Sequence, residues 1–234
     1  WFTETDKVYF IKDIQYQRNT INRIICYFNP KLFTLLNKYT KLRREKKKIL
    51  QTTQDNSWLI SIDKQLFDIG RSIIEIKKKF LEEFQNFLSD KNKLFFDFEI
   101  MPSFGLSQTE NFLESFQKGL SDESRWPNDQ TLHPNHDPKK SVFEITHNQK
   151  NISQLSSAQS KMLILSLLLG CAKFLNHNRI TIFLIDEIFD NFDMINIQKV
   201  IQYCAENKFQ TFFSTTDNFT LQGNIDNLEI KEIF

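Results

Sequence analysis

The sequence predicts an α/β fold, a lobe built on a parallel β-sheet that carries an antiparallel α-helical hairpin arm. Two patterns predict it. Between residues 29 and 88, apolar side chains recur at steps of three and four, as they do along one face of a long helix. Beyond residue 140, short apolar runs alternate with helical segments, which is typical of a parallel sheet.

The arm is expected to consist of two long helices joined by a polar loop. A strand-like piece, Val8 to Ile11, and a helix lead into it, and Asn29-Pro30 favours a new helix start. The apolar stripe of the first arm helix is Leu32, Leu35, Tyr39, Leu42 and Ile49, with Lys46 interrupting it. After the loop Gln51 to Ser57, the second stripe is Ile62, Leu66, Ile69, Ile73, Ile76, Phe80, Phe84 and Phe87. At about 1.5 Å per residue, Trp58 to Leu88 would span roughly 45 Å.

The last third of the chain is expected to be the α/β lobe, which follows a loop from Trp126 to Lys140. Its expected elements are a strand Val142 to Ile145, a helix Ser157 to Leu175, a strand Ile180 to Ile185, a helix Met194 to Glu206 and a strand Phe209 to Ser214. The expected domain organisation is three consecutive regions. Residues 1–28 are the end of an N-terminal lobe that leads into the arm, residues 29–118 form the arm, and residues 119–234 form the C-terminal lobe.

The composition gives little support to a general affinity for nucleic acid. The 30 basic and 29 acidic side chains leave a formal charge of +1, so any contact with DNA must come from a local patch. The candidate patch is the basic end of the first arm helix: Lys41, Arg43, Arg44, Lys46, Lys47 and Lys48. These side chains could contact phosphates, although a solvated helix end has the same composition.

The cysteines and the apolar runs indicate a cytoplasmic protein. Cys26, Cys171 and Cys204 are far apart and form neither a disulfide framework nor a zinc motif. The longest apolar run, Met162 to Ala172, has eleven residues, fewer than the roughly 20 of a membrane span, so no membrane partner is expected. Asp129, His133, His136 and Asp137 could ligate a metal, but a polar loop explains them better. The chain begins with Trp1, and we expect it to be part of a longer protein.

An apolar strand that ends in two carboxylates carries the first chemical signal. Ile180 to Ile185 leads directly into Asp186-Glu187, which is the arrangement of a Walker B strand. In that arrangement the first acid holds Mg²⁺ through water, and the second polarises the water that attacks the γ-phosphate of ATP. A strand that simply ends in two solvated acids would have the same sequence.

A second signal lies about thirty residues upstream of the two acids. Leu155-Ser156-Ser157-Ala158-Gln159 opens a long apolar helix and resembles the signature motif of ABC-type ATPases. Free N–H groups and the positive end of the helix dipole suit a phosphate there, although a serine-rich helix cap is the simpler alternative. Signature, helix and Walker B strand follow one another in the order that ABC ATPases have. Downstream, Asp190 to Asp193 matches the D-loop, and Ser214-Thr215-Thr216 lies where the switch residue is expected.

Further stretches resemble the RecF family of DNA replication and repair ATPases over almost the whole chain. They are Gln17-Arg18 through Arg23, Asn29-Pro30, Tyr39, Ile62-Asp63, Gln65-Leu66, Gly70, and Thr131 to Asp137 as a worn form of a histidine-containing loop. The resemblance implies a cytoplasmic protein of recombinational repair and the SOS response to DNA damage. It would form an ATP-dependent homodimer, bind double-stranded or gapped DNA, and help to load recombinase with RecR and RecO.

The resemblance also implies cofactors and roles for single residues. ATP and Mg²⁺ would be the cofactors, with Asp186 on the metal and Glu187 as the catalytic acid. Leu155, Ser156, Ser157, Ala158 and Gln159 would contact the nucleotide of the other subunit, together with Asp193 of the D-loop and Thr215 and Thr216 of the switch.

Departures from the family pattern limit what this chain can do alone. No Gly-x-x-x-x-Gly-Lys-Ser/Thr loop occurs, and the family places that P-loop upstream of the region that corresponds to Trp1. Ala158 replaces the signature glycine. We therefore expect no ATP hydrolysis by the chain itself and a weak ATPase when the P-loop is supplied. The alternatives are a truncated remnant that acts as a non-enzymatic interaction module, or another ABC or SMC-like repair ATPase.

Overall fold

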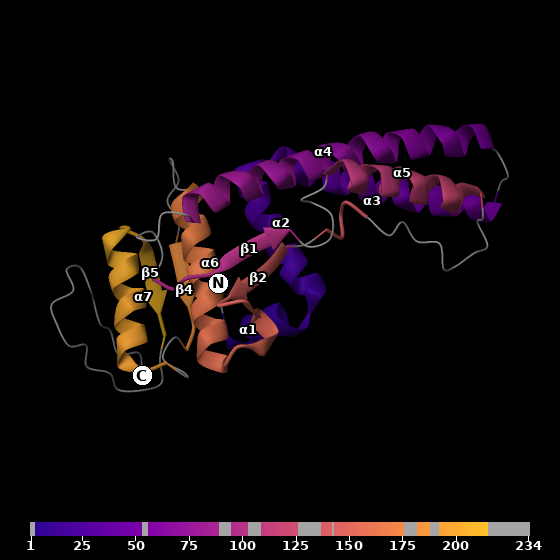
Figure 1. The fold of residues 1–234 in the computed structure, drawn as a ribbon. Helices are drawn as coiled ribbons and strands as arrows, with labels where there is room; N and C mark the ends of the chain where they lie inside the picture. The colour runs from indigo at the N-terminus through magenta and orange to yellow at the C-terminus, as the bar shows by residue number, and fades with distance from the viewer. Residues whose placement is uncertain are drawn as a thin grey trace. The chain divides into compact units, whose positions relative to one another are not determined.

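The computed structural model of the chain describes residues 3–52, 56–88, 95–102, 109–125, 137–141, 143–175, 182–187 and 192–214 (Figure 1). The chain divides into two compact units. The sheet unit comprises Trp1–Gln17, Phe84–Glu99 and Ile145–Phe234, and the helical unit comprises Arg18–Glu83 and Ile100–Glu144. The units interleave along the chain, unlike the three consecutive regions expected from the sequence, and those regions stay a prediction.

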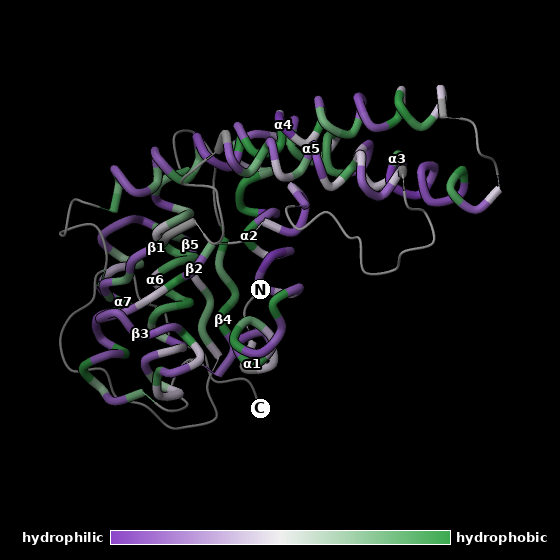
Figure 2. Tube along the Cα trace, turned by 45° about the vertical axis from the view of Figure 1, so that its right-hand side comes forward, coloured by the Kyte–Doolittle hydropathy of each residue, from purple (hydrophilic) through white to green (hydrophobic). Residues whose placement is uncertain are grey.

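Three long helices form most of the helical unit: α3 (Lys31–Thr52), α4 (Asn56–Leu88) and α5 (Thr109–Arg125). Before them, α2 (Ile14–Phe28) ends at the predicted break, where the Asn29 side chain accepts a hydrogen bond from the Lys31 N–H at 3.1 Å. Hydrophobic and hydrophilic residues alternate along α4, so that each turn carries both kinds (Figure 2). Most residues of the predicted stripes on α3 and α4 are buried, with Leu35, Ile76 and Phe87 half-buried, and their role as an arm stays a prediction.

The third helix, α5, is a difference from the sequence analysis, which assigned no element to its residues and drew a region boundary inside it. Its apolar face, Phe112, Phe116 and Leu120, is buried. Gly70 on α4 allows the close approach of this face, because a Cβ atom there would lie 2.6 Å from Cε1 of Phe116. Glycine at this position thus permits two helices to pack more closely than any other residue would.

A buried ionic cluster joins α3 to both neighbouring helices. Lys46, which interrupts the predicted stripe, is 1% exposed, and its amine donates to the Leu120 carbonyl oxygen at 2.7 Å. The same amine lies 2.6 Å from the Asp63 carboxylate and 3.1 Å from that of Glu123. Arg43 donates two hydrogen bonds to Glu123, at 2.6 and 3.0 Å. The interruption is therefore a lysine whose charge is satisfied inside the helical unit.

The sheet unit opens with a helix where a strand-like piece was predicted. Residues Val8 to Ile11 lie inside α1 (Glu4–Lys12), so the strand prediction is wrong. Thr3 caps this helix: its side chain accepts from the Asp6 N–H at 3.2 Å, and the Asp6 carboxylate accepts from the Thr3 N–H at 2.9 Å. This reciprocal capping box favours a helix over the extended form that the short apolar run favours.

Two separate sheets lie among the described residues. One has the strand order β1-β2-β3, with β1 Glu99–Pro102, β2 Phe143–His147 and β3 Lys150–Asn151. In it β2 pairs antiparallel with β3. The other holds β4 (Ile182–Ile185) and β5 (Gln210–Phe213), which are parallel. The predicted parallel sheet is therefore present as this pair. Residues 143–145 of the predicted strand Val142 to Ile145 belong to the other sheet, as part of β2.

Helix α6 (Ser157–Leu175) lies in the core of the sheet unit. Its residues Leu163, Ile164, Leu165, Leu167 and Leu169 are all buried, as expected of a helix that is apolar on every side. Among the described residues it is the one helix long and apolar enough to cross a membrane, and 61% of its apolar window is buried inside the protein. The last helix, α7 (Met194–Glu206), contacts α6, where the Lys173 amine lies 5.4 Å from the centre of the Tyr203 ring.

Candidate nucleotide site

The parallel pair brings the predicted acidic residues to one edge of the sheet unit. The strands are in register from Ile182 opposite Gln210 to Ile185 opposite Phe213, so Asp186-Glu187 and Ser214 follow them side by side. Carboxyl ends of parallel strands are the usual place for ligands in α/β folds. Both carboxylates are half-buried.

Ser214 connects the two acids at this edge. Its N–H donates to the Ile185 carbonyl oxygen at 3.0 Å, which continues the ladder beyond β5. Its hydroxyl donates to the Asp186 carboxylate and accepts from the Glu187 N–H, at 3.2 Å for the second bond. Residue 214 therefore orients the proposed metal ligand and the backbone of the proposed catalytic acid together. Thr215 and Thr216, the expected switch residues, lie outside the described residues.

A residue that the sequence analysis did not assign holds Glu187 in place. Lys161, on the first turns of α6, is fully buried, and its amine donates to the Glu187 carbonyl oxygen at 2.6 Å. The amine also lies 5.3 Å from the centre of the Phe192 ring. Glu187 has a φ of 49°, in the left-handed region that is unfavourable for a glutamate. The helix that starts at the signature-like motif thus contacts the backbone of the Walker B-like turn.

A signal for Lys161 was present in the sequence. It is the one charged residue between Ser157 and Ala172, a stretch whose other residues, apart from Gln159, are apolar or small. A lysine in the interior requires an acceptor, because a buried ammonium without one is strongly destabilising. Its acceptor could not be identified from the sequence, because Glu187 lies 26 residues further along the chain.

The signature-like residues form the exposed start of α6. The Ser156 hydroxyl accepts from the Gln159 N–H at 3.3 Å, and the Gln159 side chain accepts from the Ser156 N–H at 3.1 Å. Ser156 is therefore the cap of this helix, the geometry that both interpretations of the motif require. Ser156, Ser157 and Gln159 are exposed, whereas Leu155 and Ala158 are half-buried.

Lys7 is a second lysine at this helix start that the sequence analysis did not assign. It lies on α1, is almost fully buried, and its amine donates to the Ser157 hydroxyl at 2.9 Å. The sequence contains no signal for this pairing, since 150 residues separate the two side chains.

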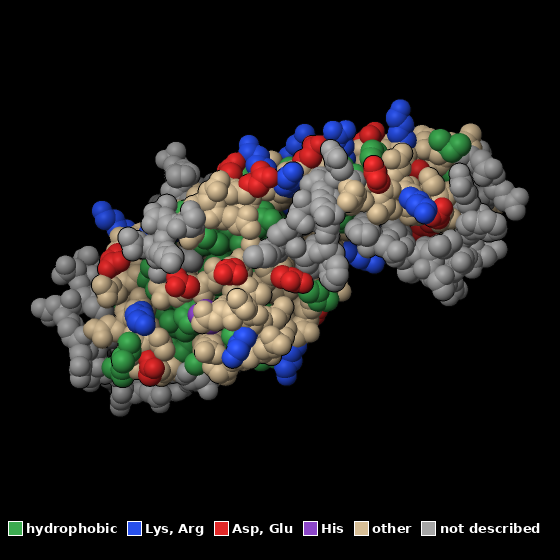
Figure 3. Space-filling model, in the orientation of Figure 1, with side chains coloured by type: hydrophobic (Ala, Val, Ile, Leu, Met, Phe, Trp, Pro, Cys, Tyr) green, Lys and Arg blue, Asp and Glu red, His purple; other side chains and the backbone are tan. Residues whose placement is uncertain are grey.

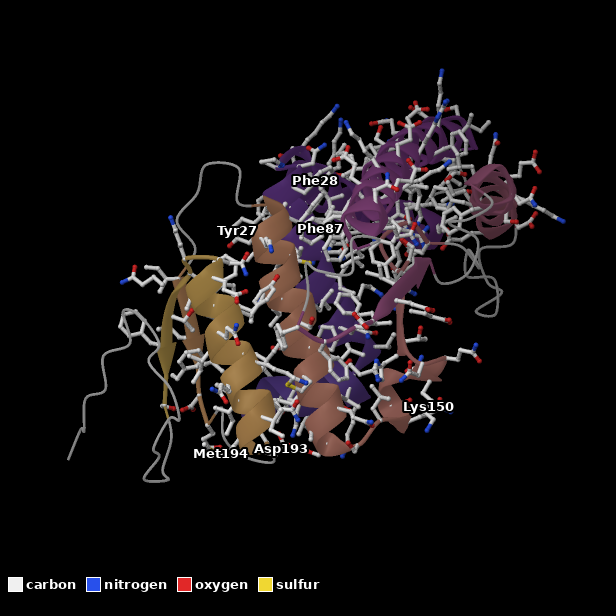
Figure 4. The ribbon with its side chains drawn as sticks, turned by 60° about the vertical axis from the view of Figure 1, so that its left-hand side comes forward. Tyr27, Phe28, Phe87, Lys150, Asp193 and Met194 are labelled. Atoms are coloured by element: carbon white, nitrogen blue, oxygen red, sulfur yellow. The ribbon has the colours of Figure 1, made fainter. Side chains whose placement is uncertain are left out.

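Asp193, the predicted acid of the D-loop, caps α7. Its carboxylate accepts from the Asn196 N–H at 2.8 Å, and Figure 4 labels it next to the exposed Met194. Asp190 and Asn191 of the predicted D-loop lie outside the described residues, as do Asp129, His133 and His136. Among the residues that the structure does describe, no three His, Cys, Asp or Glu side chains gather into a metal site. Asp186 stays the predicted magnesium ligand.

The basic residues of α3 separate into two groups in the helical unit. Arg43 and Lys46 pair with acids inside the helical unit, and their predicted contact with phosphates stays a prediction. Lys41, Arg44, Lys47 and Lys48 are exposed. Along α4, acidic and basic side chains alternate (Figure 3), with pairs such as Arg71 and Glu75 at 2.9 Å. The exposed basic residues of α3 stay a predicted DNA contact.

Comparison with known proteins finds relatives over nearly the whole chain. No protein-family model matches. The "DNA replication and repair protein RecF" of Rickettsia massiliae is 26% identical over an alignment of 242 positions. The alignment covers 99% of this chain and 66% of that protein. The protein of the same name from Rickettsia prowazekii is 25% identical over 226 residues, 93% of this chain and 63% of that protein. The chain thus spans just under two-thirds of the length of these relatives.

Solved structures show the same fold. A structure described as the recombination mediator protein RecF-ATP in the RecFOR pathway has a TM-score of 0.67 and 19% identity, and covers 92% of this chain and 62% of its own. A second, described as RecF-ATPrS, has a TM-score of 0.66, also with 19% identity and the same coverage. The predicted resemblance is therefore confirmed, as is the α/β class of the fold, whereas the ABC-type sheet lobe and the hairpin arm stay predictions.

Proposed function

We propose that this chain, a divergent relative of the RecF replication and repair proteins, supplies the signature and the acidic residues of an ATP-gated DNA-binding dimer. The observation that supports this best is the arrangement at the end of β4 and β5. Asp186, Glu187 and Ser214 share one edge, and Lys161 joins this edge to α6, the helix that Ser156 caps. The helix that follows the signature-like residues is thus hydrogen-bonded, through Lys161, to the turn that carries the two acids.

Each of these residues has a definite part in the proposed reaction. Asp186 would hold Mg²⁺ through water, and Glu187 would orient the water that attacks the γ-phosphate. The start of α6 would receive the γ-phosphate of the other subunit, with Ser156 adding a hydroxyl to the free N–H groups. Asp193, Thr215 and Thr216 complete the predicted set. Binding of ATP would close the dimer, and slow hydrolysis would open it.

The role in DNA metabolism comes from the relatives. They are named DNA replication and repair proteins, and the similar structures are described as a recombination mediator of the RecFOR pathway. We extend this role to the chain: it would act in the cytoplasm, bind duplex or gapped DNA as an ATP-dependent homodimer, and help to load recombinase with RecR and RecO as partners.

The test requires a P-loop, which this chain lacks. A fusion would place the N-terminal segment of the Rickettsia massiliae relative, to which the resemblance assigns the P-loop, before this chain. The fusion should hydrolyse ATP slowly, and the chain alone should not. The variant Glu187→Gln should bind ATP, lose turnover and accumulate as a dimer, because the carboxylate that orients the water is gone.

Two results would contradict the proposal. Turnover by the Glu187→Gln fusion equal to that of its parent would exclude Glu187 as the catalytic acid. A fusion that binds ATP without ever dimerising would favour the alternative, a non-enzymatic interaction module. Ala158 in place of the signature glycine is the feature of this sequence that favours that alternative.

A further inference from the structure

A groove lies in the helical unit between α2 and α3, which meet at the Asn29-Pro30 turn. Its volume is about 390 Å³, enough for a group the size of one nucleotide. The lining residues recur at steps of three and four on both helices, from Asn19 to Tyr27 and from Phe33 to Thr40, so each helix presents one face to the groove. Lys139 completes the lining. The proposed ATP chemistry uses none of these residues.

Two aromatic rings are exposed in this groove. Tyr27, at the end of α2, is 65% exposed, and Phe33, in the first turns of α3, is 63% exposed. The neighbouring ring, Phe28, which Figure 4 labels beside Tyr27, instead packs on Phe80 with 5.5 Å between ring centres. The exposed ring faces of Tyr27 and Phe33 are therefore not packed in the hydrophobic core. Exposed rings on both sides of a groove are suited to stacking with flat groups such as nucleobases.

The charged side chains of the groove are basic. Arg23 and Lys139 line it and are exposed, and no acidic residue is among the described lining residues. The Lys139 amine donates to the Thr40 hydroxyl at 3.0 Å, which keeps the ammonium beside the groove. The nearby carboxylate of Asp137 accepts from the Lys139 backbone N–H at 2.8 Å and is not part of the lining.

Amide side chains supply the remaining polarity. Asn19, Asn22 and Asn37 line the same groove, and an amide both donates and accepts, as the edges of nucleobases do. An apolar peptide helix would leave the two cations and three amides without partners. A duplex hides the faces of its bases, so only an unpaired strand can stack on Tyr27 and Phe33.

We propose that this groove binds an unpaired nucleic-acid strand, with bases stacked on Tyr27 and Phe33 and phosphates held by Arg23 and Lys139. The proposal rests on the DNA-binding role proposed above and adds where, and in which form, the nucleic acid is held. It requires neither ATP nor the dimer, so the chain itself is the material for the test.

The main experiment measures binding of a fluorescent single-stranded oligothymidylate by anisotropy. Tyr27→Ala and Phe33→Ala should each weaken binding roughly 5- to 100-fold, because stacking on an aromatic side chain is lost. Tyr27→Phe keeps the ring and should bind within about twofold of the parent. Trp58→Ala is the matched control, since Trp58 is an exposed aromatic on α4 outside the groove. Arg23→Gln and Lys139→Gln should each lower the salt dependence of log K by about 0.7.

Two further measurements locate the strand. An oligonucleotide with 5-iododeoxyuridine should crosslink under ultraviolet light to the peptides that contain Tyr27 or Phe33. Cys26 lines the groove and is partly exposed, whereas Cys171 and Cys204 are buried, so a bound strand should slow alkylation of Cys26. Burial raises the pKa of the Cys26 thiol, so the alkylation is best run at mildly alkaline pH.

Three results would overturn the proposal. The first is unchanged binding by both alanine variants, and the second is duplex binding at least as tight as single-strand binding. The third is displacement of the labelled strand by polyglutamate as effective as displacement by unlabelled strand, which would mark a site for acidic peptides. Circular dichroism melting of each variant confirms that it is folded. ATP-dependent dimerisation of the fusion without single-strand binding by the chain would reject this site and leave the proposed function intact. Single-strand binding in this groove without ATP-dependent dimerisation of the fusion would support this site and reject the proposed ATP-gated dimer.

Discussion

Replacing Lys161 with methionine should release the backbone of Glu187 and leave the sheet unit folded. The Lys161 side chain is fully buried, and its amine donates to the Glu187 carbonyl oxygen at 2.6 Å. Methionine is flexible and of similar length, so it can fill the same space without charge. The variant thus removes one hydrogen bond without opening a large cavity.

The size of the effect follows from the contacts at Glu187. A hydrogen bond from a charged donor contributes about 1.5–3 kcal/mol. Glu187 has a φ of 49°, a conformation that costs a residue other than glycine about 1–2 kcal/mol, so the turn relaxes once the bond is gone. The Glu187 N–H donates to the Ser214 hydroxyl, and its exchange with solvent should become roughly 10- to 150-fold faster. The global free energy of unfolding should change less, because the variant also removes a buried cation.

Amide hydrogen exchange followed by NMR measures this on the chain itself. Lys46→Met is the matched control, since Lys46 is also a buried lysine but lies in the helical unit. It should destabilise that unit and leave the exchange of Glu187 unchanged. The reasoning is refuted if Lys161→Met leaves Glu187 exchange at the parent rate, or if it accelerates exchange equally throughout α6.

Two more substitutions test the helical unit by urea unfolding. Gly70→Ala would place a Cβ atom 2.6 Å from Cε1 of Phe116. The cost of overpacking should exceed the gain in helix propensity, so the free energy of unfolding should fall by up to about 2 kcal/mol. A variant more stable than the parent would contradict this close approach. Burial lowers the pKa of Lys77 to about 7, whereas the unfolded lysine stays charged to about 10.5, so the unfolded state binds more protons between these values. Stability should therefore rise with pH across that window, by at most about 1.4 kcal/mol per pH unit, and Lys77→Met should remove this dependence. Equal pH dependence in parent and variant would show that Lys77 is charged in the folded state.

The long helices could be predicted because their signal is local and repeated. The stripe from Ile62 to Phe80 gives the same information at every turn, and the structure buries most of it. The acids after β4 could be predicted for a similar reason, because a continuous apolar strand followed by two carboxylates is a compact pattern. Residues that directly follow a strand lie at its carboxyl end, so their place at the edge of the parallel pair could be predicted as well.

The misses have two physical causes. The run Val8 to Ile11 has strand-forming residues, but a capping box formed by Thr3 and Asp6 favours the helix more strongly than a four-residue run favours a strand. The second cause is distance along the chain. The buried charge of Lys46 is explained by Asp63 and Glu123, and no local pattern connects these residues.

We propose that the start of α6 faces the phosphate of a partner subunit, and Ser156→Asp in the fusion tests this most directly. Aspartate is as good a helix cap as serine and favours the positive end of the dipole, so the helix should keep its stability. Its charge would, however, repel the γ-phosphate. Ser153→Asp, an exposed change just before this helix start, is the control.

Sedimentation of both variants with and without ATP, beside thermal melting, gives the answer. The account predicts normal melting for both variants, ATP-dependent dimers for Ser153→Asp, and monomers at every ATP concentration for Ser156→Asp. Dimerisation of Ser156→Asp at the ATP concentration that the parent requires would contradict the account, because Ser156 would then be a helix cap and nothing more.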